Sequence, residues 1–287
     1  MTEHSSLYNA GDLAEVFSDV STHMLVSGII RDQLTNNRDV REEAFKGSAI
    51  SGCKTVLDLG CGFGFFTGGL AGKVSQDAHV TGIDRYEKYR DPYLETAEKA
   101  GIKGSFISKG IMALDDLPAN VYDLVICSYA LYFFPEYISQ VARILKPKGL
   151  FIVITHSCPH MKELTFLVKG ILESADIPHD HLLPYEQLIN RFCDYNGTGL
   201  LNPWFGNIYR KEFRSEIIFK SADFEKFAEY FRFKFPFFIP SGKGKEKKLT
   251  GLVMKKVKLL LKETGSFLIT KDDTIFICSK PLKHKMK

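Results

Sequence analysis

Short apolar runs alternate with helical stretches between residues 55 and 155, and this alternation constrains the fold more than any other feature of the chain. The runs are TVLDL (55–59), HVTGID (79–84), GSFIS (104–108), YDLVICS (122–128) and LFIVIT (150–155). Each run has the length of a buried strand, and the stretches between the runs have room for crossing helices or turns. The pattern predicts βαβ units in an α/β fold, wound into a right-handed, doubly wound parallel sheet.

Three segments flank this core, which we place at residues 51–155. Residues 1–50 form a helical leader, because apolar residues recur there at helical spacing. Residues 156–240 break the rhythm and predict a lid inserted after the fifth strand, ending in a stretch rich in Phe and Tyr. Residues 241–287 predict a basic amphipathic helix and two closing strands around a Lys-Asp-Asp turn.

Composition excludes several classes of protein. A chain of 287 residues with 45% hydrophobic and 25% charged residues matches ordinary globular usage. The longest nearly apolar run, Leu124–Phe134, is shorter than the roughly 20 residues of a membrane-spanning helix. The first residues lack the basic flank of a signal peptide, so we expect a cytoplasmic protein without membrane association. The six cysteines form no C-x-x-C pair, and we predict neither a disulfide framework nor a metal site.

Charge is distributed unevenly along the chain. Residues 241–287 contain 13 Lys and 4 acidic residues, a net charge of +9, which leaves −5 on residues 1–240. A basic segment of this kind can bind nucleic acid or an anionic surface, or it can be a solvated helix face. We favour the solvated face and predict no nucleic-acid partner.

Three glycines at alternate positions, Gly60, Gly62 and Gly64, follow the first predicted strand in VLDLGCGFGFFT (56–67). Glycines allow a sharp turn there and let a ligand lie against bare main chain. The next helix should begin near Phe65, so its N-terminal amides face the same crevice at the carboxyl end of the strand. A small polar ligand is predicted at this place.

A nicotinamide or flavin dinucleotide is one alternative for that ligand. Its G-x-G-x-x-G fingerprint requires glycine at position 65, where this chain has Phe65. Asp58 lies two residues before the first glycine, and its carboxylate would repel phosphates. A cationic or zwitterionic ligand therefore suits the crevice better.

The pattern D-x-G-x-G-x-G that begins at Asp58 resembles the first motif of class I S-adenosylmethionine-dependent methyltransferases. Further landmarks agree with this resemblance: Asp84, twenty residues after Gly64, the segment 122–136, and the helix, Lys-Pro-x-Gly turn and strand of 142–155. The similarity covers about residues 55–155, a third of the chain. It implies the Rossmann-like fold of that family, S-adenosylmethionine as cofactor, and methyl transfer as the activity.

The resemblance also implies which residues bind the cofactor. Asp84 would accept hydrogen bonds from both ribose hydroxyls. The family usually has an acidic residue after the third strand for adenine, whereas this chain has FISKGIMAL (106–114), so backbone amides near Gly110 and Ile111 would hold the adenine. The full predicted set is Asp58, Gly60, Cys61, Gly62, Gly64, Asp84, Arg85, Gly110, Ile111 and Ser128. A plain turn or capping role for Asp58 or Asp84 stays open.

For catalysis we predict His156, directly after the fifth strand, as a general base, together with Tyr129 after the fourth strand. Structural roles for both residues remain alternatives. An acceptor pocket is expected from the leader, the 129–134 loop and the lid, with substrate contacts from Tyr8, Tyr132 and Trp204. Such an aromatic enclosure binds flat rings or amine cations.

This pocket favours a small-molecule acceptor, methylated at nitrogen or oxygen. The layout of the segments is similar to that of small-molecule methyltransferases, including histamine-type N-methyltransferases. Two other functions remain alternatives. One is an RNA or protein methyltransferase that uses the basic segment, and the other is a non-catalytic cofactor-binding partner subunit.

Overall fold

The computed structural model describes residues 7–36, 38–239 and 246–282, and the chain divides into two compact units. The helical unit comprises Met1–Asn37, Pro159–Ile189 and Arg214–Asp272. The sheet unit comprises Arg38–Cys158, Asn190–Phe213 and Asp273–Lys287. Each unit is therefore built from three separate stretches of the chain.

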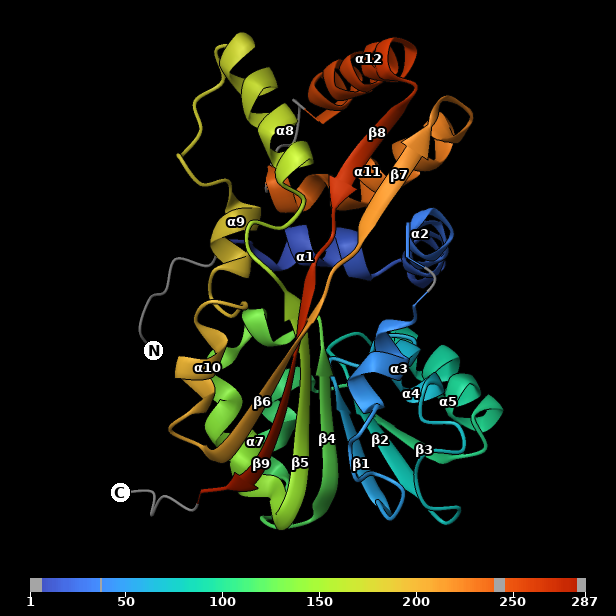
Figure 1. Cartoon of the computed structure of the whole chain (residues 1–287), viewed down its shortest axis with the longest axis vertical. Helices are drawn as coiled ribbons and strands as arrows, with labels where there is room; N and C mark the ends of the chain where they lie inside the picture. Colours follow the sequence, from blue (N-terminus) through green and yellow to red (C-terminus); the bar gives the residue numbers. More distant parts are fainter. Residues whose placement is uncertain (1–6, 37, 240–245, 283–287) are drawn as a thin grey trace. The chain divides into compact units, whose positions relative to one another are not determined.

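The sheet unit contains a seven-stranded sheet in the order β3-β2-β1-β4-β5-β9-β6 (Figure 1). Neighbouring strands from β3 to β5 are parallel, and β9 runs antiparallel to β5 and β6 on its two sides. The strands are β1 (Thr55–Leu59), β2 (His79–Ile83), β3 (Lys103–Ile107), β4 (Tyr122–Ser128), β5 (Leu145–His156), β6 (Phe205–Phe213) and β9 (Asp273–Pro281). The five parallel strands confirm the predicted doubly wound, Rossmann-like fold.

Helices and 3-10 turns connect these strands. The α-helices are α3 (Val40–Phe45), α4 (Phe65–Gly68), α5 (Arg90–Lys99), α6 (Ala113–Asp116), α7 (Ile138–Ile144) and α10 (Gly197–Leu201). The 3-10 turns are η1 (Glu87–Tyr89), η2 (Gly110–Met112), η3 (Leu131–Phe133) and η4 (Pro135–Tyr137). The helix expected to begin near Phe65 does so as α4, and it ends at Gly68. Farther along the chain, Gly72 has a φ of 67°, outside helical geometry.

Glycine also sets how closely α5 packs on the sheet. A Cβ atom at Gly82 in β2 would lie 2.5 Å from the Tyr93 ring of α5. Tyr93 is completely buried beneath the strand. The missing side chain thus lets a tyrosine fill the space between helix and strand, close to the end of β2 that carries the site.

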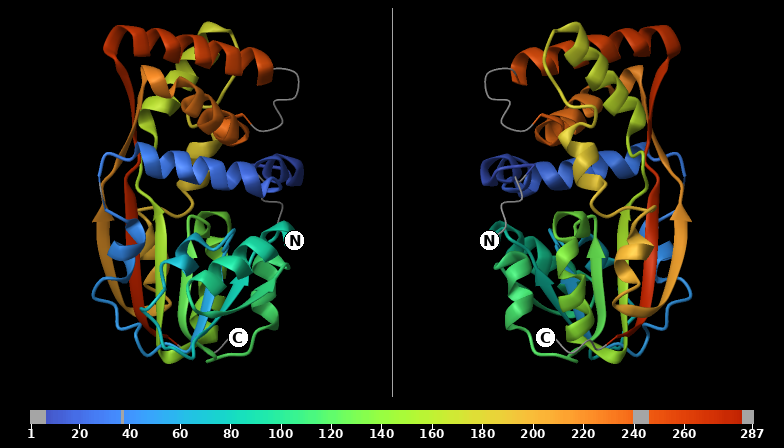
Figure 2. Two further views of the ribbon diagram at one scale, coloured as in Figure 1. Left: turned by 90° about the vertical axis from the view of Figure 1, so that its right-hand side faces the viewer. Right: turned by 90° about the vertical axis from the view of Figure 1, so that its left-hand side faces the viewer.

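The helical unit contains six α-helices among the described residues and a two-stranded sheet. The elements are α1 (Ala10–Phe17), α2 (Val20–Gln33), α8 (Lys162–Ser174), α9 (Pro184–Ile189), α11 (Phe224–Phe238), α12 (Glu246–Thr264), the 3-10 turn η5 (Ser221–Asp223), β7 (Glu216–Lys220) and β8 (Ser266–Thr270). Helix α11 lies between α12 on one side and α1 and α2 on the other (Figure 2). The buried aromatic side chains of α11 form the core of this unit.

The predicted leader helix is divided in two. Helix α1 ends at Phe17, and Asp19 caps the start of α2 by accepting a hydrogen bond from the Thr22 amide at 3.2 Å. A capping aspartate satisfies an amide that would otherwise have no partner, which explains why the chain begins a new helix here.

The closing strands differ from the expectation. They form at the expected residues, but β8 pairs with β7 in the helical unit, whereas β9 pairs with β5 and β6 in the sheet unit. The predicted lid is likewise divided, because residues 205–213 form β6 of the large sheet. Strand pairing between distant segments decides both outcomes, and a local pattern does not encode it.

Within the described ranges, no single helix is long and apolar enough to cross a membrane, and α1 with α2 meets that test only as a pair bent by 65°.

Candidate active site

The glycine motif forms a tight loop between β1 and α4. Gly60, Gly62 and Gly64 have φ angles of 71°, 49° and 85°, in the left-handed region that other residues rarely adopt. The amides of Gly60 and Cys61 donate to the Ile83 carbonyl at 2.8 and 3.1 Å, which fixes the loop against the end of β2. The alternating glycines are thus required by the backbone conformation.

Asp58 lies at the base of this loop and is 1% exposed. Its Oδ2 accepts a hydrogen bond from the Thr67 hydroxyl of α4 at 2.7 Å, while its buried Oδ1 has no hydrogen-bond partner in the described structure. Burial raises the pKa of the Asp58 carboxyl to about 6. A buried carboxylate oxygen without a donor is costly unless a ligand supplies one, and the amino group of a zwitterionic ligand would do so.

Asp84 follows β2 and closes the other side of the loop. Its Oδ2 accepts from the Gly62 amide at 3.0 Å and its Oδ1 from the Tyr86 amide at 3.1 Å. Burial raises the pKa of Asp84, although these backbone amides oppose the shift. The Gly110 amide donates to the Asp84 carbonyl at 3.0 Å, which brings the start of η2 to the same edge.

Most predicted cofactor residues therefore gather at the carboxyl ends of β1 and β2. Arg85 is exposed and lies beside Gly110, since a Cβ atom added at Gly110 would be 3.4 Å from the Arg85 Cβ. Ile111 follows in η2, and Ser128 ends β4, the strand next to β1. The glycine cradle and the buried acceptor of Asp58 fit S-adenosylmethionine, whose amino acid end carries an ammonium group.

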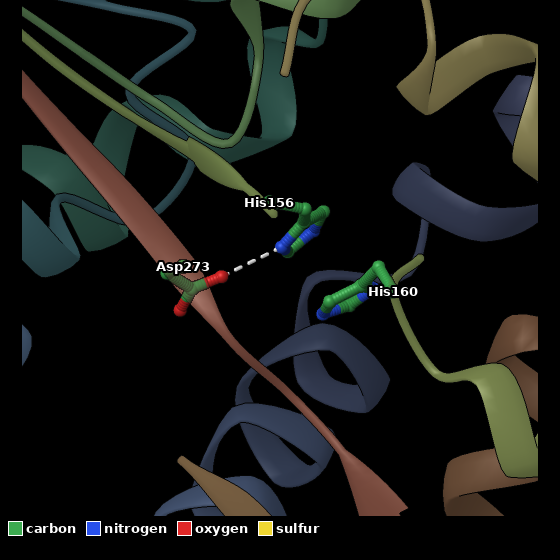
Figure 3. Close-up of side chains that lie close together, drawn as sticks. All are labelled: His156, His160 and Asp273. Carbon is green, nitrogen blue, oxygen red and sulfur yellow. Dashed lines mark hydrogen bonds and ion pairs between the residues drawn. The ribbon is translucent and has the colours of Figure 1, made fainter. Parts of the chain in front are cut away.

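A second cluster lies where β5 and β9 meet. His156, the last residue of β5, pairs in register with Asp273, the first residue of β9. Its Nδ1 faces Asp273 Oδ1 at 2.8 Å (Figure 3). Both side chains are buried. Tyr129, just after β4, donates its hydroxyl to Asp273 Oδ2 at 2.7 Å. One carboxylate therefore organises both residues that the sequence nominated for catalysis.

The aromatic rings of this cluster are stacked. The centroid of the Tyr129 ring lies 4.9 Å from that of the His156 ring, and the two ring planes are inclined by 26°. The Tyr132 ring also stacks on His156, with centroids 5.8 Å apart and planes inclined by 22°. Burial, and next the charge of Asp273, raises the pKa of both tyrosine hydroxyls, so each stays protonated at neutral pH. Tyr129 has a φ of 53°, and this unusual conformation for a bulky residue needs support from its surroundings.

Two contacts connect the glycine loop with this second cluster. Phe66 of α4 meets the Tyr129 ring edge-on, with centroids 6.3 Å apart. A Cβ atom at Gly60 would lie 2.6 Å from the Ala130 Cβ, so the loop runs directly against the chain after β4. Both clusters thus belong to one continuous edge of the sheet unit.

The predicted substrate residues occupy different places. Tyr132 belongs to the cluster around His156. Tyr8 is buried in the helical unit, where its hydroxyl donates to the Phe237 carbonyl at 2.8 Å. Trp204 precedes β6 and accepts a backbone hydrogen bond from Leu282, at the end of β9 remote from Asp273. The structure does not bring Trp204 to the edge that carries His156.

His160, also drawn in Figure 3, belongs to the helical unit, where its ring is hydrogen-bonded to Tyr185. Two other side chains of the site escaped the sequence analysis. Thr67 ends the glycine motif, and its position nine residues after Asp58 was the available signal. Asp273 belongs to the expected Lys-Asp-Asp turn, and only the pairing of β9 with β5 brings it beside His156.

Comparison with known proteins identifies the family. Residues 50–196, about half of the chain, match a family described as a methyltransferase domain. The chain is 24% identical over 127 residues to the uncharacterized methyltransferase YcgJ of Bacillus subtilis. The aligned region covers 43% of this chain and 49% of YcgJ. It is 28% identical over 135 residues to the ubiquinone biosynthesis O-methyltransferase of Vibrio cholerae, covering 45% and 54%. The matches thus span about half the length of these curated relatives.

Solved structures share the fold. The YcgJ structure superposes with a TM-score of 0.53 at 15% identity, covering 84% of this chain and 97% of YcgJ. A phosphoethanolamine N-methyltransferase of Haemonchus contortus superposes with a TM-score of 0.50 at 17% identity, covering 94% and 59%. The family match, the shared fold and the glycine loop agree, and the chain belongs to the class I S-adenosylmethionine-dependent methyltransferase family.

Proposed function

We propose that this protein transfers a methyl group from S-adenosylmethionine to a nitrogen or oxygen atom of a small-molecule acceptor. The observation that supports the proposal most is the single edge of the sheet unit that carries both the cofactor cradle and the His156–Asp273 pair. When bound, S-adenosylmethionine supplies an electrophilic methyl group on a sulfonium sulfur. The protein then has to align the acceptor and remove its proton.

The glycine loop and the two acidic residues would hold the cofactor. Asp58 Oδ1, buried and without a donor in the described structure, would accept from the ammonium group of the cofactor. Asp84 would take the ribose hydroxyls, because it ends the neighbouring strand and its carboxylate is fixed by the amides of Gly62 and Tyr86. The backbone near Gly110 and Ile111 would carry the adenine.

His156 would act as the general base. Hydrogen bonding of Nδ1–H to Asp273 leaves the lone pair of the imidazole on Nε2, which can accept a proton from a phenol or an ammonium ion. Asp273 stabilises the imidazolium that results and orients the ring, so it is a positioning residue. Tyr129 restrains the same carboxylate from its second oxygen.

The names of relatives support a small acceptor, and they include both an oxygen and a nitrogen methyltransferase. The relative from Vibrio cholerae is called an O-methyltransferase of ubiquinone biosynthesis. The Haemonchus contortus enzyme, an N-methyltransferase, was solved with phosphomonomethylethanolamine and S-adenosylhomocysteine. We leave the acceptor atom open between oxygen and nitrogen, and the rings of Tyr129 and Tyr132 favour a flat or cationic group.

The basic segment has a sufficient structural explanation. Helix α12 buries Leu249, Val253, Val257 and Leu261, while its lysines lie on the exposed side. This is the arrangement of an amphipathic helix that covers a core. An RNA or protein acceptor is therefore not needed to explain the basic segment.

The first test is calorimetric titration with S-adenosylmethionine, S-adenosylhomocysteine and NAD. We expect binding of the first two ligands and none of NAD. Radiolabelled methyl transfer is then measured with panels of amines, phenols, RNA and protein. Transfer to an amine or phenol supports the proposal, transfer to RNA or protein alone contradicts the small-molecule acceptor, and failure to bind S-adenosylmethionine contradicts the activity itself.

A further inference from the structure

Two cysteines from separate segments of the chain meet in the sheet unit, and neither was assigned a role above. Cys158 lies two residues beyond the end of β5, and Cys193 precedes α10. Their sulfur atoms and a carboxylate oxygen of Asp194 all lie within 4.8 Å of one another. None of the other described cysteines belongs to such a group.

The surrounding hydrogen bonds hold the two cysteine backbones in place. The Cys158 amide donates to Asp194 Oδ1 at 2.8 Å, and the Thr155 hydroxyl donates to the Phe192 carbonyl at 2.8 Å. The Cys193 amide donates to Asn196 Oδ1 at 2.8 Å. The first two bonds tie β5 and Cys158 to the segment before α10, so the two cysteines remain neighbours.

The two thiols differ in reactivity and access. Cys193 is completely buried, and hydrogen bonding from the Cys158 thiol lowers the pKa of Cys193 although burial opposes the shift. The backbone amides of Tyr195 and Asn196 lower this pKa further. Cys158 is partly exposed, and its Sγ lies 3.3 Å from Asn190 Oδ1, an alternative acceptor for the same S–H proton. A partly exposed thiol beside a buried thiol with a lowered pKa is the arrangement in which a mixed disulfide on the first is resolved by the second.

A metal ion suits the same group less well. Asp194 already accepts from the Cys158 amide, and the Arg210 guanidinium lies 3.5 Å from its Oδ2. A cation bound to this carboxylate would be repelled by Arg210. A disulfide requires only the two sulfurs, which have to close to about 2.05 Å by rotation of their side chains.

We propose that Cys158 and Cys193 are a thiol-oxidation site. Oxidised glutathione, or a similar small disulfide, is the oxidant, and the product is an intramolecular disulfide between the two cysteines. Cys158, as its thiolate, attacks one sulfur of oxidised glutathione, and the sulfur–sulfur bond of glutathione breaks to release one glutathione. Cys193, as its thiolate, then attacks the Cys158 sulfur and releases the second glutathione. Two cysteine thiols lose their protons and two electrons, and two glutathione thiols gain them.

The position of the pair gives the bond a clear structural consequence. The chain leaves the sheet unit after Cys158, passes through Pro159–Ile189 of the helical unit, and returns at Asn190. A disulfide between Cys158 and Cys193 would join the points of departure and return within the sheet unit. The α8 and α9 segment would then be closed into a covalent loop.

The test uses the full-length reduced protein in glutathione buffers of increasing oxidised fraction. After quenching, remaining thiols are alkylated and the protein is digested for mass spectrometry. We expect a peptide pair linked through Cys158 and Cys193, the loss of two titratable thiols, and full reversal by dithiothreitol. Cys193→Ser should instead accumulate one glutathione on Cys158, and Cys158→Ser should form no linked peptide.

Cys53→Ala is the matched control, because it removes a buried cysteine outside the pair and should form the same disulfide as the wild type. Retention of both thiols in fully oxidised buffer would overturn the proposal, and so would a stable glutathione adduct on wild-type Cys158 without a linked peptide. Stoichiometric zinc binding that protects both thiols and is lost in Cys158→Ser would assign a metal site instead.

Discussion

Two regions of the sheet unit present chemical groups at the same edge, and they are built in different ways. The glycine-loop region, residues 58–84, draws its contacts from two adjacent strands and the turn between them. The dyad region consists of the hydrogen-bonded pair His156 and Asp273, called the dyad, together with Tyr129. Tyr129 and Asp273 are 144 residues apart in the sequence. The first region depends on local backbone conformation, and the second depends on the pairing of β5 with β9.

Because of this difference, substitutions in the two regions should have different effects. A side chain added to the glycine loop disturbs the backbone itself, since its left-handed angles leave few alternatives. A changed side chain in the dyad region leaves the strands in place and alters only hydrogen bonding and charge. We therefore expect substitutions to separate cofactor affinity from turnover.

The largest effect is expected from Gly60→Val. The residue has a φ of 71°, and its Cβ would lie 2.6 Å from the Ala130 Cβ, so the loop must move. We expect S-adenosylmethionine affinity to fall at least about 100-fold, which is a loss of about 2.7 kcal/mol in calorimetry. Gly72→Val is the matched control, because it has a φ of 67° but no atom within 4 Å of its Cβ. Equal loss of affinity in both variants would show that close packing is not the cause.

Asp273→Asn should sharpen the contrast by affecting turnover alone. The amide cannot stabilise the imidazolium of His156 as a carboxylate does, and we expect kcat to fall about 100-fold with unchanged cofactor affinity. The neighbouring Asp272→Asn removes a carboxylate that instead accepts from the Ser215 amide, and it should retain normal kcat. The pH profile of kcat should move in the first variant only. Normal kcat in Asp273→Asn would remove the dyad from catalysis.

Asp84→Asn should have a smaller effect on the other region. The neutral side chain keeps one acceptor oxygen, for either the Gly62 or the Tyr86 amide, and its NH2 group cannot accept from the other. We expect cofactor affinity to fall about tenfold, or about 1.4 kcal/mol, with little change in kcat. Asp77→Asn, an exposed acid before the amino end of the same strand, should bind normally. Unchanged affinity in Asp84→Asn would exclude the ribose role.

The smallest effect concerns pH. The pKa of Asp58 is raised to about 6 by burial, and its charged form attracts the ammonium group of the ligand. Affinity should therefore be highest above pH 6 and fall about fourfold between pH 7.5 and 5.5 as the carboxyl is protonated. Thr67→Val removes a hydrogen bond that lowers this pKa, so the decline should begin at higher pH. A pH dependence that persists in Asp58→Asn would have to come from another group.

The same comparison explains what could be read from the sequence. All five parallel strands and the acidic residues at the ends of β1 and β2 were predicted, because periodicity and glycine spacing are local signals. Asp273 was missed, since its partner His156 is 117 residues away and only strand register joins them. The separation of β8 from β9 and the inclusion of β6 in the large sheet escaped prediction for the same reason. His156 itself could be nominated because it ends a predicted strand.

The place of β9 also governs the order in which the molecule can assemble. Strand β6 has β9 as its partner in the large sheet, and β9 is inserted between β5 and β6 although it is made last of the seven strands. During synthesis, β1 to β5 can form their parallel pairs while β6 waits for residues 273–281 to leave the ribosome. Closure of the sheet and arrival of Asp273 beside His156 are then a single late event. A nascent chain that has not reached β9 can already have its glycine loop, but it has no dyad.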